Sequence, residues 1–259
     1  MYKTMNCLLA VLVAAGTAQA QLSFTGTNLT ENFDGMPSTG TTALNGTTGT
    51  QTNITGATGW QATRVAGTGT TLSLIADNGS STTGAVFSYG AAGTTERALG
   101  SLASGANAPG FGVSITNNAS AAIDTVTLSF SREQWRSSTT TANTLTFAYA
   151  VSGGTATNAN FITDASAILN PLGDLVGGAA VAANGALDGN ANSIAVSFTF
   201  SVSVGVGQTL FLRWQDFNDL GSDAGLAIDN FTFAATTVPT PGAAGLLGLG
   251  GLLISRRRR

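Results

Sequence analysis

The stretch SIAVSFTFSVSV, Ser193–Val204, decides the fold class. Apolar residues fill every second position, and small or hydroxylated residues lie between them. The apolar positions are Ile194, Val196, Phe198, Phe200, Val202 and Val204. Successive side chains of a β-strand point to opposite faces, so the pattern predicts a strand with one buried and one solvent-exposed face. A surface helix would instead repeat its apolar residues every three or four positions.

The same alternation recurs along the chain. It is clear in residues 126–130 (VTLSF) and 145–151 (LTFAYAV). Because each such strand has one apolar face, two sheets packed face to face bury them all, which predicts an all-β antiparallel β-sandwich of the jelly-roll, lectin-like class. Shorter strands, bounded by Gly, Asn, Asp or Ser clusters, are predicted at residues 61–66, 71–75, 85–89, 111–116, 210–214 and 226–233.

Two segments lack the alternation. Residues 39–59 are rich in Thr, Gly and Asn, and we expect an exposed loop there. Residues 164–190 are rich in Ala and Gly around Pro171, which predicts a long loop with one helical turn.

The N-terminus has the features of a secretory signal peptide. Lys3 supplies a positive charge, residues 7–15 (CLLAVLVAA) are apolar, and the small residues Ala18 and Ala20 flank one glutamine. The apolar run is well short of the roughly 20 residues that span a membrane. We therefore expect residues 1–20 to be removed on export.

The C-terminal residues 238–259 read VPTPGAAGLLGLGGLLISRRRR. Two prolines precede an apolar run, residues 242–254, and four arginines follow it. A basic end stays on the cytoplasmic side of a membrane. The run counted back to Val238 has seventeen residues, the lower limit for a helix that crosses a membrane. This order predicts a short transmembrane helix that directs the chain to its destination.

The tail resembles the PEP-CTERM sorting signal of bacterial exported proteins. Threonine stands where the usual proline motif has glutamate. The resemblance implies an exosortase-like sorting enzyme as partner, transient anchoring in the inner membrane, and transfer to the cell surface or extracellular space. The residues that match the motif positions and the basic end are Pro239, Thr240, Pro241, Arg256, Arg257, Arg258 and Arg259.

The central region also carries a resemblance. The segments FSREQWR, LTFAYAV and LFLRWQDFNDLGSDAGLAIDNF, within residues 33–233, resemble a β-sandwich region of PEP-CTERM and other exported proteins that is likened to concanavalin-type jelly rolls. The resemblance implies a surface or matrix domain with no assigned reaction.

Composition excludes several functions. Without the two termini the chain has five arginines against thirteen acids, a net charge of −8, which disfavours nucleic-acid binding. The chain has no histidine and its single cysteine, Cys7, lies in the leader, so Ser-His-Asp catalysis and the usual zinc sites are excluded. A glycosidase would need two carboxylates, but no spacing singles out a pair, and we expect no enzyme. The plausible sources are Glu31, Asp34, Glu96 and Glu133.

An acidic stretch near the end of the central region offers oxygen ligands for calcium, the one candidate cofactor. Its spacing is not that of an EF-hand. Asx-turns in a tight loop explain the same residues without a metal, and both alternatives stay open. The candidate ligands are Asp216, Asn218, Asp219, Asp223 and Asp229.

Trp135, flanked by Glu133 and Arg136, follows a clear strand and is a candidate for stacking on a sugar ring. The alternative, which we favour, places Trp135 in the core while Glu133 and Arg136 pair across neighbouring strands. Trp214 shares a face with apolar neighbours and is predicted to be core.

The sequence therefore predicts three parts: a signal peptide (1–20), a β-sandwich (21–237) and a sorting signal (238–259). The first hypothesis for function is a non-enzymatic exported surface or extracellular-matrix protein associated with exopolysaccharide or biofilm. The alternative is a carbohydrate-binding module with calcium as its candidate cofactor, and extracellular polysaccharide as its partner.

Overall fold

The computed structural model describes residues 21–140 and 142–238. The predicted signal peptide, with Ala18 and Ala20, and the sorting signal from Pro239 to Arg259 lie outside these residues. Within the described residues no helix is long and apolar enough to cross a membrane.

Strands account for nearly all the regular structure, in two eight-stranded sheets, and the described residues contain one short 3₁₀ turn. The elements are β1 (Leu22–Phe24), β2 (Leu29–Glu31), β3 (Thr41–Leu44), β4 (Thr52–Asn53), β5 (Trp60–Ala66), β6 (Leu72–Asp77), β7 (Ala85–Tyr89), β8 (Ala98–Leu102), β9 (Ala108–Asn117), β10 (Ala122–Arg136), β11 (Thr144–Val151), β12 (Ile168–Leu169), η1 (Pro171–Gly173), β13 (Leu175–Val176), β14 (Ser193–Val204), β15 (Thr209–Asp216) and β16 (Gly225–Val238).

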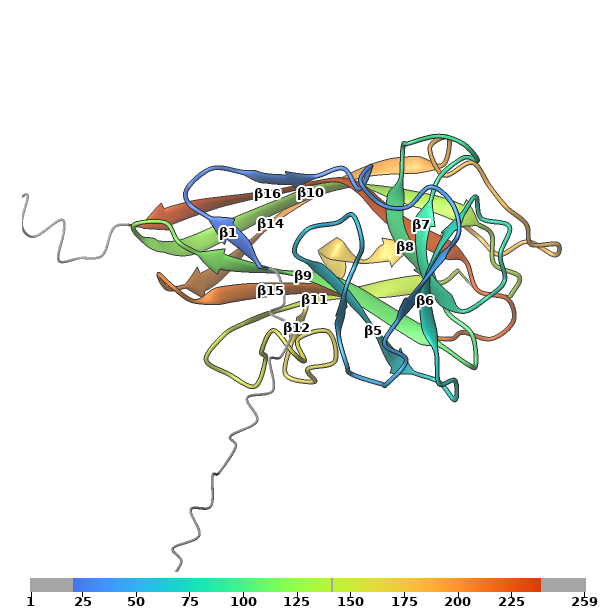
Figure 1. The fold of residues 1–259 in the computed structure, drawn as a ribbon. Helices are drawn as coiled ribbons and strands as arrows, with labels where there is room; N and C mark the ends of the chain where they lie inside the picture. Colours follow the sequence, from blue (N-terminus) through green and yellow to red (C-terminus); the bar gives the residue numbers. More distant parts are fainter. Residues whose placement is uncertain (1–20, 141, 239–259) are drawn as a thin grey trace, which may run out of the picture.

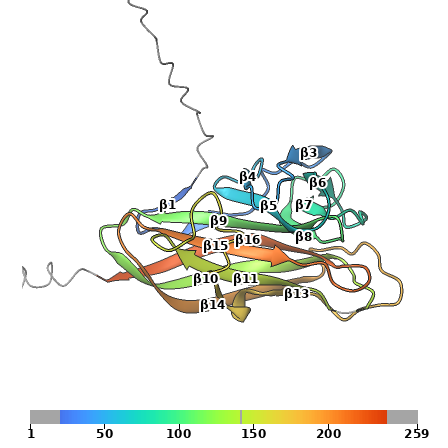
Figure 2. The same cartoon turned by 90° about the horizontal axis from the view of Figure 1, so that it is seen from below.

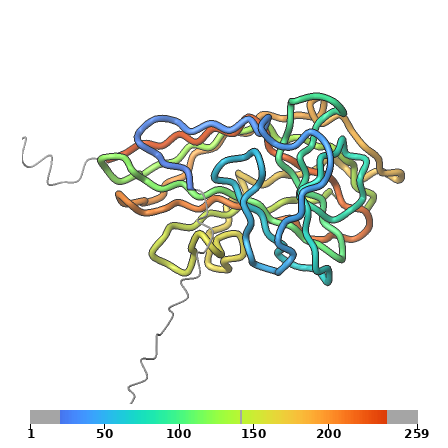
Figure 3. Tube along the Cα trace, in the orientation of Figure 1, coloured from blue at the N-terminus to red at the C-terminus, as the bar shows by residue number. Residues whose placement is uncertain are grey.

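Sheet A has the order β12-β11-β15-β9-β5-β4, with β1 beside β9 and β13 beside β11. Sheet B has the order β14-β10-β16-β8-β7-β6-β3, with β2 beside β16. The long strands run along the length of the molecule, and β4 to β8 gather at one end (Figures 1 and 2). The N-terminal segment lies beside the last strand (Figure 3), where β2 pairs with β16. The all-β sandwich predicted from the sequence is confirmed.

The pairing is not wholly antiparallel. β1 runs parallel to β9, and β6 runs parallel to β7. Both exceptions involve short strands next to longer antiparallel pairs. The predicted antiparallel sandwich is therefore correct for the long strands and wrong for these two pairs.

The alternation in the sequence predicts most of the buried faces, but Ile194, at the start of β14, is 52% exposed and was wrongly placed on the buried face. In β14, Phe198, Phe200 and Val204 are buried while the serines and threonine between them are exposed. In contrast, β8 was missed because it is buried on both faces and shows no alternation: Leu99 lies in the main core, and Ala98 and Leu102 in a second cluster.

The predicted loop at residues 39–59 is wrong in part. It contains β3 and β4, and Leu44, Ile54 and Ala57 are buried there. These strands have two to four residues and sit at sheet edges, so they carry too few alternating positions to be recognised. The segment 164–190 does hold one helical turn, η1, as predicted, but also β12 and β13.

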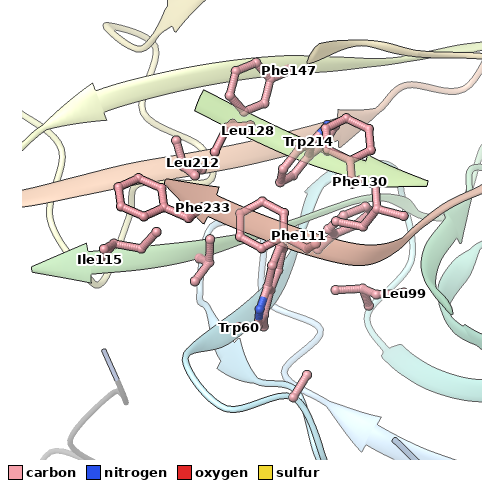
Figure 4. Packing of buried hydrophobic residues seen from close by; sticks show 14 of the residues in the cluster. Trp60, Leu99, Phe111, Ile115, Leu128, Phe130, Phe147, Leu212, Trp214 and Phe233 are labelled. Atoms are coloured by element: carbon pink, nitrogen blue, oxygen red, sulfur yellow. The ribbon is translucent and has the colours of Figure 1, made fainter. Parts of the chain in front are cut away.

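An aromatic cluster fills the space between the sheets (Figure 4), and Trp214 lies at its centre. Its ring centroid lies 4.9 Å from that of Phe147 and 5.8 Å from those of Phe111 and Phe130. The ring also stacks on Trp60 at 6.0 Å. Its indole Nε1 donates to the backbone carbonyl of Gly173, 2.9 Å away, so η1 is tied to the core.

Two smaller clusters cover the outer faces. On sheet B, Phe87, Tyr89, Leu102 and Trp135 are buried together. On sheet A, Phe161 and Ile162 of a loop pack against Phe211 of β15. Sheet faces that would otherwise be wet are thus covered by loops, which explains why every residue of β15 is buried.

Replacing Trp214 with alanine should lower the free energy of unfolding by about 3–5 kcal/mol, because it leaves a cavity among five aromatic rings and an unpaired Gly173 carbonyl. Guanidinium denaturation of the full chain measures this. Phe217→Ala is the control, since Phe217 is 45% exposed and should change stability little. Equal stability of the two variants would contradict the central role of Trp214.

Candidate functional site

The sequence-predicted residues Glu133, Trp135 and Arg136 lie at the end of β10, on the outer face of sheet B. The prediction that they follow a strand is wrong, because β10 continues to Arg136 through its pairing with β16. The pairing continues through three register shifts, between Ile123 and Thr125, between Ser129 and Ser131, and between Gln134 and Arg136. Such bulges interrupt the alternation of apolar and polar residues, so the end of β10 could not be predicted from the sequence.

Trp135 is buried, at 2% exposure. Its ring stacks on Tyr89 with centroids 5.8 Å apart and an angle of 3°, and Tyr89 stacks in turn on Phe87 at 4.8 Å. Gly189 lies so close to the indole that a Cβ there would come within 2.2 Å of Nε1. The ring is thus enclosed, and stacking on a sugar through its face is not available in this structure.

Glu133 and Arg136 are buried too, but they do not pair with each other. Glu133 Oε2 accepts a hydrogen bond from Trp135 Nε1 at 2.9 Å. Arg136 Nη1 donates to the carbonyls of Gly79 and Ser80 at 3.0 and 3.2 Å. Burial raises the pKa of Glu133 to about 7, and the carboxylates of Asp229, Glu96 and Asp188 act in the same direction.

Two loops flank the end of β10. Arg136 holds residues 79–80 of the β6–β7 loop. Leu187 donates its backbone N–H to the Trp135 carbonyl at 2.7 Å, and Ala186 forms a β-bridge with Arg136. These contacts fix residues 79–80 and 186–187 beside the end of β10.

A groove lies between these loops. One depression, of about 270 Å³, has an apolar lining from Ala91, Ala92, Leu187 and the Trp135 edge, with Asp188 also at its wall. The other residues that line it are Asn78 and Ala186. An adjoining depression of about 270 Å³ shares Asn78 and Ala92 with it. This second part is more polar, because its lining includes Ser38, Thr39, Asp77 and Arg97.

Sequence reasoning missed the groove. Asn78-Gly79 and Asp188-Gly189 are recognisable turn signals, but nothing local shows that two turns over 100 residues apart meet beside Trp135. Only the pairing of β10 with its neighbours brings them together.

The five residues predicted as calcium ligands do not gather at one place. Asp216, Asp219 and Asp223 lie near one another, with Asn143 donating from Nδ2 to Asp219 at 2.6 Å and to Asp223 at 3.5 Å. The exposed Asn218 lines a separate depression with Asp223. Asp229 lies elsewhere, on the outer face of sheet B, where its carboxylate meets those of Glu96 and Glu133.

The carboxylates that remain in the predicted calcium loop have protein partners. Asp216 Oδ2 accepts from Ser101 Oγ at 2.8 Å, and Asp223 accepts from the backbone N–H of Asp219 at 3.2 Å. Neither hydrogen bond is an Asx-turn, since Ser101 lies on a distant strand and the Asp219 N–H precedes Asp223 in the chain. Burial raises the pKa of Asp216 well above its usual range, and burial raises that of Asp223 to about 6.

The raised pKa of Asp223 makes stability depend on pH. The folded state holds its proton more tightly than the unfolded state does, so the stabilisation is fully present below about pH 4 and is lost as the pH rises through about 6. In Asp223→Asn, which keeps a side-chain acceptor, the loss of stability between pH 4 and pH 7 should shrink by on the order of 2 kcal/mol.

Urea denaturation at the two pH values measures the effect. Asp124→Asn removes an exposed carboxylate and serves as the control. The explanation fails if Asp223→Asn and the wild type lose the same stability between pH 4 and pH 7.

No protein-family model matches the chain, and no curated protein matches it in sequence. Among solved structures, the chain is similar to the CBM22-1 xylan-binding domain from Paenibacillus barcinonensis Xyn10C, with 12% identity, a TM-score of 0.31, and coverage of 83% of this chain and 98% of that one. It is also similar to TmCBM61, solved in complex with β-1,4-galactotriose, with 9% identity, a TM-score of 0.28, and coverage of 56% and 74%.

Both neighbours are carbohydrate-binding modules by name. TM-scores this low do not establish a shared fold, and the identities are too low to carry a function across. The function of this chain is therefore argued from its own residues.

Proposed function

We propose that this chain is a non-enzymatic, exported surface or matrix protein whose β-sandwich binds carbohydrate. The observation that carries the proposal is the groove beside Trp135, which joins an apolar part to a polar part. Sugars present the same combination, with C–H groups on the faces of the ring and hydroxyl groups around its rim. Ligand sites commonly have such a largely apolar lining with a few polar groups that fix orientation.

The two parts of the groove have distinct roles in the proposal. Ala91, Ala92 and Leu187 contact the C–H face of a sugar residue. Asn78 and Asp188, both exposed, hydrogen-bond its hydroxyl groups. The Trp135 ring supports the floor of the groove through its packing on Tyr89 and does not stack on the ligand.

A non-catalytic role fits the carboxylates better than hydrolysis does. Glu133 and Asp229 are 2% and 4% exposed, so a glycosidic bond in the groove does not reach them directly. A glycosidase needs one carboxylic acid and one carboxylate in contact with the scissile bond. These acids therefore support the site from beneath.

Ala92→Trp tests the groove, because Ala92 is exposed and lines both depressions. The indole should fill the space and weaken polysaccharide binding at least 10-fold while the thermal unfolding temperature stays unchanged. Binding of the full chain to immobilised polysaccharides, including xylan and β-1,4-galactan, measures the effect.

The matched control is Ala159→Trp, an exposed alanine in the loop that covers sheet A. It should bind as the wild type does. Wild-type binding by Ala92→Trp, or no binding to any polysaccharide of the panel by the wild type, would refute the proposal.

The proposed location rests on the two termini. The leader directs export, and the tail resembling a PEP-CTERM signal directs sorting by an exosortase-type system to the cell surface or matrix. Deleting residues 242–259 should release unsorted protein into the medium, because the apolar run and the arginines are lost together. Fractionation of the producing cells measures this, and unchanged surface delivery of the truncated chain would contradict it.

A further inference from the structure

We propose that Glu96, Glu133 and Asp229 bind a divalent cation, calcium by preference, on the outer face of sheet B. Each residue offers a carboxylate oxygen, and these oxygens lie within 4.8 Å of one another. They form the only such group of acids in the described residues. Two of the three, Glu96 and Glu133, were not among the residues predicted from the sequence as metal ligands.

Three neighbouring parts of sheet B supply the ligands. Glu133 lies on β10, Asp229 on the adjacent β16, and Glu96 just before β8, which pairs with β16. Next to Asp229, Asn230 has φ of 50°, where the β10–β16 register shifts. Between the inward-facing Ile228 and Phe231 this bulge inserts one extra residue, and Asp229 points outward to the other carboxylates.

Unpaired oxygens give independent evidence for a ligand. Asp229 is 4% exposed, and its Oδ1 is buried without a hydrogen-bond partner among the described residues. The same holds for Oε1 of Glu96. A buried carboxylate oxygen without a partner is costly unless a cation compensates for it. A cation between these groups would satisfy both atoms.

Neutral donors orient the other oxygens. Asn230 Nδ2 donates to Asp229 Oδ2 at 2.6 Å, and Asn190 Nδ2 donates to Glu96 Oε2 at 2.7 Å. Trp135 Nε1 fills the same role for Glu133. Each carboxylate is thus held by at least one side-chain N–H donor, as metal-binding carboxylates commonly are.

The surrounding charge favours a cation. The carboxylates of Asp34 and Asp188 add to the negative charge of the three proposed ligands. The nearby Arg97 directs its Nε to Ser88 Oγ, 2.9 Å away. Arg97 also interacts electrostatically with Glu96, so it offsets part of this charge, but the acids around the site outnumber it.

The donor set points to calcium. All three ligands are carboxylates, and hard oxygen ligands select calcium or magnesium over zinc or copper. Calcium takes ligands at 2.3–2.6 Å, so opposite ligands can lie almost 5 Å apart, whereas magnesium at 2.0–2.1 Å needs a tighter cluster. Water and backbone oxygens would complete its coordination.

The cation would also organise the groove, a consequence that rests on the proposed carbohydrate function. Glu96 lies near the end of the loop that carries Ala91 and Ala92, and Asn190 lies in the turn that begins at Asp188. Glu133 holds Trp135. A bound ion would tie these elements together, so polysaccharide binding should require calcium.

Calorimetric titration of the metal-free full chain with calcium chloride tests the site. We expect one bound ion and a rise in the unfolding temperature of about 5–10 °C at a hundredfold excess over Kd. Magnesium chloride should bind at least 10-fold more weakly. No heat and no thermal shift with calcium would overturn the proposal.

Asp229→Asn should weaken calcium binding at least 10-fold. Its metal-free form should unfold at the same or a higher temperature than the metal-free wild type, because a buried charge is removed. Asp219→Asn, in the other acidic cluster, is the matched control and should bind calcium normally. Loss of binding in Asp219→Asn but not in Asp229→Asn would place the ion in the other loop and refute this site.

Polysaccharide binding with and without a chelator separates the two proposals. Calcium binding without any polysaccharide binding would leave the cation site standing and refute the carbohydrate function. Polysaccharide binding that is unchanged by the chelator would refute the link between ion and groove.

Discussion

Burial of aromatic side chains between the two sheets is the interaction on which the rest of the structure depends. Trp214 contacts rings from both sheets, and its N–H ties η1 to the same core. Without cysteine in residues 21–238 no disulfide can stabilise this sandwich, so the burial of apolar area has to do so. Strand positions, and with them every outward-facing residue, follow from this packing.

The outer face of sheet B combines two kinds of residue that rarely share a surface. Phe87, Tyr89 and Trp135 form an apolar stack, and Glu133 and Asp229 lie beside it with little exposure. The stack fixes the floor of the groove, while Asp229 and Glu96 each have one buried oxygen without a hydrogen-bond partner. The carbohydrate proposed for the groove and the cation proposed below it would account for both features at once.

How much of this was predictable depended on the kind of strand. β14 was predicted with its bounds and most of its buried face, because period-two alternation marks a strand with one solvent-exposed face, but Ile194 at its start is exposed. β8 was missed because it is buried on both faces and its sequence does not alternate. The edge strands β3 and β4 were missed because they are too short to show an alternation.

The sequence by itself determined the fold class, the core position of Trp214 and the scarcity of catalytic residue types, since these follow from local pattern and composition. Only the tertiary structure decided that Trp135 is enclosed. It also decided that Asp229 lies apart from Asp216, Asp219 and Asp223, with its carboxylate next to those of Glu96 and Glu133. The physical reason is that a site across β8, β16 and β10 depends on strand order and on a bulge at Asn230, which no spacing along the chain reports.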